Sequence, residues 1–390
     1  MTVNTTSTCY DVCIIGGGVM GCTTALFLAR AGMKVVLLER NALCRGASGV
    51  NAGTLTLHMT RAALVPYALK AWEMWMHPET WLGNGVLATA APGLSLAFTA
   101  AEQDLLEQRA AARREYGADI RLVSGREARE IEPCIPDSCL SAAYCETDGY
   151  ASAYLTGKAF HAALSQAGVT IIENADVDQI TPPGKCYQVS ARGGQIRVSA
   201  TRLVMAGGVW LEPLLALLGI TIPVKTLVNQ LIVTERMPPV MRTVLSIANG
   251  LLSMKQFANG TVLIGGGWQG RGHRDSGRPE TIPENLTGNL RLGQYVCPAL
   301  ANARVARIWL GFESETADAM PMIGPLSEYP DLYVIGCVHS GYTSGPWMGK
   351  LLADAILGNL PEMPLFNPSR LIIPAGVQSE NFAEKQNEQQ

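Results

Sequence analysis

The sequence is poor in charged residues and has no long run of a single sign. Asp, Glu, Lys and Arg make up 16% of the 390 residues, the formal net charge is −3, and no basic run extends beyond Arg113-Arg114. Nucleic-acid partners call for clustered lysine and arginine, so the composition argues against nucleic-acid binding. The length favours two structural domains rather than a single core.

The sequence also lacks the spacings of metal and hydrolase sites. The ten cysteines form no CxxC pair, the cluster of Cys134, Cys139 and Cys145 has no usual ligand spacing, and the five histidines form no metal-ligand cluster. No Gly-x-Ser-x-Gly elbow occurs. We therefore expect no metal, no catalytic triad, and reduced, mostly buried thiols in a cytoplasmic protein.

An uncharged run from Val12 to Ala29 raises the alternative of a membrane or signal segment. No positive segment precedes it, and no small-residue cleavage site follows it. Its first third contains three consecutive glycines, and Arg30 and Lys34 then limit its apolar length. We predict no transmembrane segment, which leaves peripheral membrane association open.

The same region has the pattern of a strand, a glycine turn, a helix and a second strand. Asp11 to Ile15 is short and apolar, as a buried parallel strand would be. Val19 to Ala31 has helical spacing and ends at Gly32, a typical C-terminal cap, and Lys34 to Leu38 is a second strand. The pattern predicts a βαβ unit.

Within this unit, Gly16, Gly18 and Gly21 have the GxGxxG spacing of a dinucleotide cradle. The first glycine makes the tight turn, the second admits a pyrophosphate, and the third lets helix and strand pack closely. The helix N-terminus then faces the phosphates, and Glu39 at the end of the second strand can accept hydrogen bonds from a ribose diol. The motif alone leaves nicotinamide and flavin cofactors open.

The segment from Arg40 to Leu55 favours a flavin, because it is a small-residue loop rather than another βαβ repeat. From Tyr10 to Pro368 the chain resembles the D-amino acid oxidase-type superfamily of FAD-dependent amine oxidoreductases. The resemblance implies an α/β architecture, with a Rossmann-type (glutathione reductase-like) FAD domain and a discontinuous α+β substrate domain built on an antiparallel sheet. It also implies FAD, which we expect to be bound non-covalently.

The resemblance assigns the FAD contacts to separated segments. Glu39 and Arg40 match the ribose position, and Val177 matches the adenine contact. Arg45, Ala47 and Ser48 match the position of the pyrophosphate and ribityl chain. Asn51 to Leu55 match the backbone beside the isoalloxazine. The implied cofactor residues are Gly16, Gly18, Val19, Met20, Gly21, Glu39, Arg40, Arg45, Ala47, Ser48, Asn51, Ala52, Gly53, Thr54, Leu55, Val177, Ala206, Gly207, Gly208, Trp210, Gly311, Gly341, Tyr342, Thr343, Ser344 and Gly345.

Near the C-terminus, Leu332 to Ile335 reads as a strand, Gly341 to Pro346 as a loop, and Trp347 to Leu357 as a helix. A helix N-terminus near Gly345 would point its positive end at the flavin pyrimidine.

The expected FAD-binding domain comprises residues 8–82, 146–223 and 305–372, and the substrate domain comprises residues 83–145 and 224–304. The latter contains a helix from Thr99 to Gly117, opened by a capping box of Thr99 and Glu102. Asn249-Gly250 and Asn259-Gly260 predict hairpin turns in an antiparallel sheet. Residues 373–390 form a polar tail.

One departure from the resembled family concerns the substrate. Where the glycine oxidase-like branch has an arginine that clamps the substrate carboxylate, this chain has Glu313 in "WLGFES". A glutamate repels a carboxylate, so either another cation holds it, or the pocket prefers a cationic or bulkier secondary amine. Tyr342, His339 and His58 are the other candidate substrate-binding residues, although both histidines fit a purely structural role.

The resemblance implies oxidation of the CH–NH bond of a small-molecule, amino-acid-derived amine, with no catalytic residue besides the flavin. The departure at Glu313 favours the flavoprotein subunit of an opine or hydroxyproline dehydrogenase-like complex, with partner subunits that carry further redox cofactors. A stand-alone amino acid oxidase that makes hydrogen peroxide, and a non-catalytic flavin-bound scaffold subunit, remain alternatives.

Overall fold

A computed structural model describes residues 3–83, 85–182 and 184–374. Its first sheet has the strand order β10-β11-β12-β1-β2-β9, with β19 beside β12 and β18 beside β19. These strands are β1 (Val3–Ile15), β2 (Val35–Leu38), β9 (Thr170–Ile172), β10 (Val177–Thr181), β11 (Tyr187–Ala191), β12 (Ile196–Met205), β18 (Met322–Pro325) and β19 (Leu332–Gly336). Strands β12, β1, β2 and β9 are parallel neighbours, as the predicted Rossmann-type unit requires.

The second sheet has the order β17-β13-β16-β15-β14-β5-β7-β6. Its strands are β5 (Gly93–Ala97), β6 (Ile120–Ser124), β7 (Ser141–Cys145), β13 (Lys225–Thr234), β14 (Val244–Ile247), β15 (Ser253–Gln256), β16 (Val262–Gly265) and β17 (Val305–Glu315). All of its pairs are antiparallel except β14 with β5. Short strands β3 (Thr54–Leu55), β8 (Gly149–Tyr150) and β4 (Thr89–Ala90) form a third sheet.

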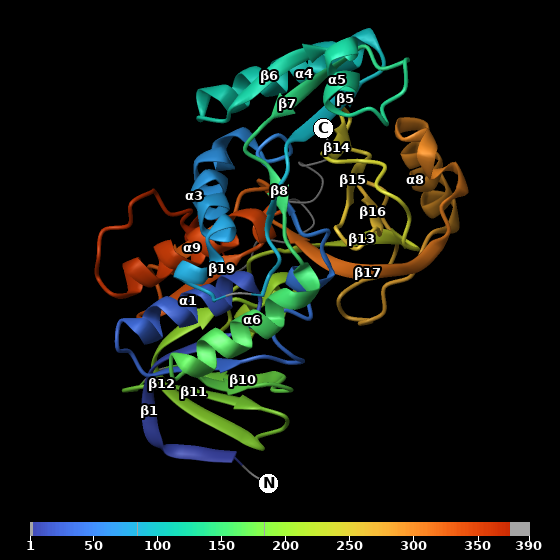
Figure 1. Cartoon of the computed structure of the whole chain (residues 1–390). Coiled ribbons are helices and arrows are strands. Elements are labelled where there is room, and N and C mark those ends of the chain that lie inside the picture. The colour runs from blue at the N-terminus through green and yellow to red at the C-terminus, as the bar shows by residue number, and fades with distance from the viewer. Residues whose placement is uncertain (1–2, 84, 183, 375–390) are drawn as a thin grey trace.

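The helices lie on both sheets (Figure 1), with α4 and α5 beside β5, β6 and β7, and α8 beside β14 to β16. They are α1 (Val19–Arg30), α2 (Ala47–Val50), α3 (Val65–Met76), α4 (Ala100–Glu115), α5 (Gly125–Ile131), α6 (Ala153–Gln166), α7 (Leu211–Ala216), α8 (Pro283–Val296) and α9 (Gly341–Ile356). Short 3-10 helices occur at η1 (Ala62–Leu64), η2 (Pro78–Thr80), η3 (Gly208–Trp210), η4 (Pro298–Asn302) and η5 (Pro368–Leu371).

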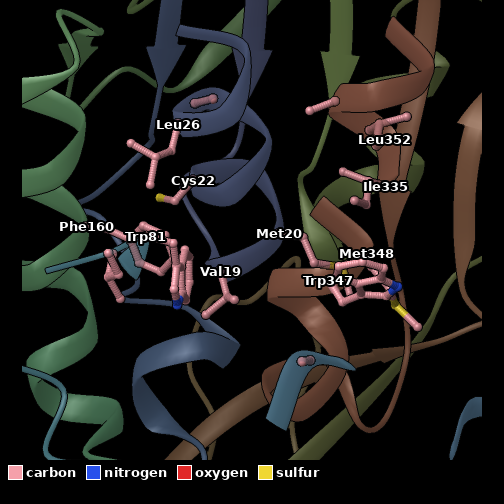
Figure 2. Close-up of a cluster of buried hydrophobic side chains, with 14 of the residues drawn as sticks. Val19, Met20, Cys22, Leu26, Trp81, Phe160, Ile335, Trp347, Met348 and Leu352 are labelled. Atoms are coloured by element: carbon pink, nitrogen blue, oxygen red, sulfur yellow. The ribbon is translucent and has the colours of Figure 1, made fainter. Parts of the chain in front are cut away.

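Helix α1 is buried on nearly all sides, which explains its lack of charge. In Figure 2, Val19 and Cys22 of this helix point toward Trp81 and toward Phe160 of α6. Met20 points the other way, toward Met348 of α9. A helix that is apolar all round is a core helix. The uncharged run from residue 12 to 29 is therefore a buried strand, turn and helix. Among the described residues, no helix combines the length and the apolar character needed to cross a bilayer.

Several local predictions are confirmed. The capping box opens α4: Thr99 accepts from the Glu102 N–H, and the Glu102 side chain accepts from the Thr99 N–H. Gly250 and Gly260 have φ angles of 81° and 88°, as the predicted turns require. The antiparallel sheet also forms as expected, apart from its one parallel pair.

Two expectations are corrected, and the division into two domains stays a prediction. Strand β17, at the start of the expected FAD-binding segment 305–372, pairs along β13 in the second sheet. Cys9 and Cys186 form a disulfide, while the other eight cysteines are free and seven of these are buried. The polar tail lies almost wholly outside the described residues.

The second correction is that α9 begins at Gly341, so residues 341–346 are helical rather than a loop. Pro346 has no N–H to donate to Tyr342, a loss that normally destabilises a helix. Here the indole N–H of Trp75 donates to the carbonyl oxygens of Tyr342 and Thr343, at 3.1 Å each. This contact from α3 compensates the missing hydrogen bond.

Candidate functional site

A cavity of about 600 Å³ lies where the first sheet meets the second, a volume typical of cofactor and ligand sites. Its walls come from the glycine turn before α1, the end of β2, helix α2, the segment after β12, strands β13 and β17, and the start of α9.

Eighteen of the predicted cofactor residues line this cavity, namely Gly16, Gly18, Val19, Met20, Gly21, Glu39, Arg40, Ala47, Ser48, Asn51, Val177, Ala206, Gly207, Gly208, Trp210, Gly311, Gly341 and Tyr342. The other predicted cofactor residues are not among its lining residues; these are Arg45, Ala52, Gly53, Thr54, Leu55, Thr343, Ser344 and Gly345. Their roles toward FAD stay predictions.

The glycine turn has the shape of a cradle for a dinucleotide. Gly16 has φ 115°, and a Cβ there would overlap the carbonyl oxygen of Ala206. A Cβ on Gly21 would overlap the carbonyl oxygen of Gly16, so turn and helix can approach only through glycine. The Val19 N–H at the N-terminus of α1 donates to Ser48 Oγ at 3.0 Å. This hydrogen bond holds α2 against the N-terminus of α1.

Glu39 lies at the end of β2, where its carboxylate is held by the backbone. Its Oε2 accepts from the Gly17 N–H at 2.7 Å, and its Oε1 accepts from the Asn41 N–H at 2.9 Å. Burial raises the pKa of Glu39, and these two hydrogen bonds oppose that rise. The remaining lone pairs can accept hydrogen bonds from a ribose diol.

Arg40 and Trp210 form a stacked wall at the same end of the cavity. The Arg40 guanidinium lies 4.0 Å from the centroid of the Trp210 ring, a cation–π contact. Trp210 meets Phe312 edge to face, with ring centroids 6.1 Å apart. This flat surface fits an aromatic or sugar ring beside the glycine turn.

Glu313 of β17 also lines the cavity and is the centre of a polar cluster. Glu313 Oε1 lies 3.0 Å from His339 Nδ1, and Asn229 donates from Nδ2 to Glu313 Oε2. Glu313 is 13% exposed, whereas His339 is 60% exposed. The hydrogen bond and charge of Glu313 raise the pKa of His339. The structure therefore brings two of the four candidate substrate residues together, on the wall of the cavity.

Tyr342 and His58 have different surroundings. The Tyr342 ring stacks on Trp75 at 4.8 Å, and its hydroxyl bonds to Thr156 Oγ1 at 2.7 Å. Burial raises the pKa of that phenol. His58 is not a lining residue; its ring nitrogens contact Asp148 and, at 3.0 Å, Ser246 Oγ, and the site is buried. This arrangement favours the structural role for His58.

A segment that the sequence reasoning missed also lines the cavity. Residues 274–277 lie between β16 and α8 and line the cavity. Arg274 donates to the carbonyl oxygens of Val209 in η3 (3.3 Å) and of Val224 (2.6 Å), and to Glu212 in α7. These contacts join residues at least 50 positions apart in the sequence, so no local sequence pattern predicts them. Asn229, adjacent to Glu313 on the neighbouring strand, was missed for the same reason.

The residues present fit FAD. Gly16, Gly18 and Gly21 would admit the pyrophosphate at the start of α1, Glu39 would hold the ribose, and the start of α9 would face the flavin. Gly341 and Tyr342 line the cavity, so the positive end of α9 lies there one turn earlier than predicted. When bound, FAD supplies a two-electron acceptor. Within the described part of the chain, no group of three or more His, Cys, Asp or Glu residues could hold a metal ion.

Comparison with known proteins agrees with this geometry. The family described as FAD dependent oxidoreductase (DAO) matches residues 11–355. The chain is 26% identical to glycine oxidase of Geobacillus kaustophilus over 89% of this chain and 93% of that protein. It is 28% identical to the opine oxidase B subunit of Agrobacterium tumefaciens, over 92% and 97% respectively.

Solved structures share the fold. The crystal structure of glycine oxidase from Geobacillus kaustophilus superimposes with a TM-score of 0.83 at 24% identity, covering 95% of this chain and 99% of that one. The L-proline dehydrogenase of P. horikoshii gives a TM-score of 0.85 at 21% identity, covering 93% and 97%. The predicted fold and cofactor are thus confirmed, and the chain belongs to the DAO family of FAD-dependent oxidoreductases.

Proposed function

We propose that this enzyme oxidises the CH–NH bond of an amino-acid-derived secondary amine that carries a cationic arm. When bound, FAD would supply the acceptor for the hydride of the α-carbon, and water would hydrolyse the protonated imine that remains on the substrate. We further propose that the chain is the catalytic flavoprotein subunit of an opine or hydroxyproline dehydrogenase-like heteromeric complex. Its partner subunits would carry the further redox cofactors that take the electrons onward.

The observation that carries the proposal is the carboxylate of Glu313 on the cavity wall. Glu313 is mostly buried, and its neighbours are a neutral amide, Asn229, and a histidine that is cationic only when protonated. With His339 neutral, Glu313 has no permanent cationic partner among the described residues. A guanidinium or ammonium group on the substrate would supply one, and a charge-assisted hydrogen bond of this kind is strong in a partly buried site.

Similarity to known proteins supports the reaction class. Relatives along most of the chain include glycine oxidases, opine oxidase B subunits and, at 28% identity, the beta chain of the sarcosine oxidase of Arthrobacter. The names of the last two describe subunits of larger enzymes, which supports a heteromeric assembly here. The cytoplasm is the proposed location, because eight of the ten cysteines are free thiols.

A stand-alone oxidase is the second candidate, favoured by the similarity to glycine oxidases. Such an enzyme would pass electrons from the flavin to oxygen and release hydrogen peroxide. A peroxide assay on the isolated chain with a substrate that reduces the flavin separates the two candidates. Peroxide formation at the rate of flavin reduction would favour the oxidase.

The test of the proposed function is anaerobic flavin reduction against opines, D-amino acids, proline derivatives and sarcosine. We expect rapid loss of the oxidised flavin absorbance with a secondary amine that has a basic arm, such as an arginine-derived opine. Reduction by none of these amines would contradict the proposal and would favour a non-catalytic scaffold subunit.

A further inference from the structure

Lys255 in β15 is a fully buried ammonium group without an acidic partner. Its side chain is 1% exposed, and its one hydrogen bond among the described residues runs from Nζ to Thr54 Oγ1 at 2.6 Å. An ammonium group has three donors, and lysine is almost never fully buried unless it is paired. Two of its three donors therefore have no protein acceptor among the described residues.

The register of the second sheet places Lys255 on the same face as the cavity-lining residues Asn229, Gly311 and Glu313, although Lys255 is not itself a lining residue. Lys255 pairs with Leu263 of β16, Leu263 pairs with Val233 of β13, and Val233 pairs with Arg307 of β17. Directly paired residues share a face, and alternate residues along a strand return to it. The same face thus carries Asn229, Trp309, Gly311 and Glu313.

The partner of Lys255 lies in the segment that continues from the cavity wall. Thr54 follows Asn51, which lines the cavity, and the Thr54 carbonyl accepts from Thr343 Oγ1 in the first turn of α9 at 2.9 Å. Nζ is therefore held between β15 and the segment predicted to lie against the isoalloxazine. Ser253, two residues before Lys255 and on the same face, has a buried hydroxyl with no hydrogen-bond partner among the described residues.

The cationic side chains that line the cavity already have partners. Arg40 stacks on Trp210, Arg274 pairs with Glu212, and His339 pairs with Glu313. An amino-acid-derived substrate brings a carboxylate that requires a cation, and the usual arginine position is occupied by Glu313. We propose that Lys255, with the hydroxyls of Ser253 and Thr54, binds the substrate carboxylate. This inference rests on the proposed function. In it, Glu313 binds the cationic arm of the substrate and Lys255 binds its carboxylate.

The pKa of Lys255 reflects burial without an acidic side chain beside it. Burial lowers the pKa of Lys255 to about 7, because the charged form is desolvated without compensation. A bound carboxylate would favour the charged form and reverse that shift.

The test uses the FAD-loaded protein with acetate and its neutral analogue acetamide as probes. Binding is followed by the flavin absorbance change and by the rise in Tm, with chloride at equal ionic strength as the reference. Wild type should bind acetate more tightly than acetamide. Lys255→Met should weaken acetate about tenfold or more and leave acetamide unchanged, since it removes a charge-assisted hydrogen bond. Lys255→Arg should restore part of the acetate affinity.

Lys158→Met, at an exposed position of α6, is the matched control and should behave as wild type. Because Lys255→Met replaces an unpaired buried charge by an apolar side chain of similar length, its Tm should not fall. Equal effects on acetate and acetamide, no acetate preference in wild type, or loss of FAD from Lys255→Met would each overturn the proposal. None of these outcomes depends on the turnover panel, so the failure of this inference is distinguishable from failure of the proposed function.

Discussion

The substitution Glu313→Gln removes one negative charge from the cavity wall and preserves the shape of the side chain. Asn229 and His339 keep a hydrogen-bonding neighbour, so the local structure should persist. The lost interaction is a charge-assisted hydrogen bond to the substrate cation, about 1.5 to 3 kcal/mol. At about 1.4 kcal/mol per factor of ten, we expect the half-saturating concentration of an arginine-derived opine to rise roughly 10- to 150-fold.

The assay is anaerobic flavin reduction by an arginine-derived and an alanine-derived opine, which share the reacting CH–NH bond. Only the arginine-derived compound has a guanidinium, so Glu313→Gln should weaken it and leave the alanine-derived opine nearly unchanged. The limiting rate of reduction should change little for either compound, because the charge lies on the binding arm. The free energy of unfolding should fall by less than about 1 kcal/mol, because the His339 side chain of the Glu313–His339 ion pair is largely exposed to solvent.

Glu315→Gln is the matched control, because it removes the same charge two residues along β17. Glu315 pairs with Arg61 and Lys225 and is not a lining residue. It should leave the preference for the arginine-derived opine intact. The reasoning is refuted if Glu313→Gln weakens both opines equally, or if Glu315→Gln has the same selective effect.

Three further results are expected. Gly16→Ala should yield protein without flavin absorbance at 450 nm, because its Cβ would overlap the carbonyl oxygen of Ala206 and its φ of 115° disfavours alanine; normal flavin content would contradict this. The pKa of His339 is raised above its ordinary 6.5 by Glu313, so the stability it contributes is full below about pH 6.5 and is lost as the pH rises through the raised value. Deprotonation of His339 frees Glu313, so the affinity for a guanidinium substrate should rise over that pH interval. If His339→Asn does not flatten this dependence of affinity on pH, the result would count against the pairing. Tyr342→Phe should lower the unfolding free energy by about 1 kcal/mol through the lost bond to α6, with flavin reduction unchanged; a large fall in the reduction rate would instead place its hydroxyl in the reaction.

Local physics made much of the FAD-binding unit predictable. The apolar strand, the glycine turn and the uncharged helix are set by residues that are neighbours in the sequence, and the structure has the helix at Val19–Arg30 against an expected end at Ala31. The capping box of α4 and the Asn-Gly turns depend on contacts only two or three residues apart. Such features can be predicted from the sequence because the interacting residues lie within the few positions that a local sequence pattern spans.

The start of α9 is a feature that local sequence patterns do not predict. Glycine and proline between residues 341 and 346 indicate a loop when helix propensity alone is considered. The helix is supported by Trp75, more than 260 residues away, which donates to the Tyr342 carbonyl oxygen that Pro346 leaves without a partner. Similarly, β17 joins the second sheet through pairing with β13, a contact that the residues of β17 do not encode by themselves.

By itself, the sequence determined the βαβ unit, the glycines that a dinucleotide requires and, through separated motifs, the flavin family. Only the tertiary structure decided which polar groups share a site. It put His339 and Asn229 on Glu313, turned the Tyr342 hydroxyl toward Thr156, enclosed His58 outside the cavity and left Lys255 buried without an acid. The physical reason is that charge recognition depends on distances and burial set by strand register and domain packing, which join residues far apart in the chain.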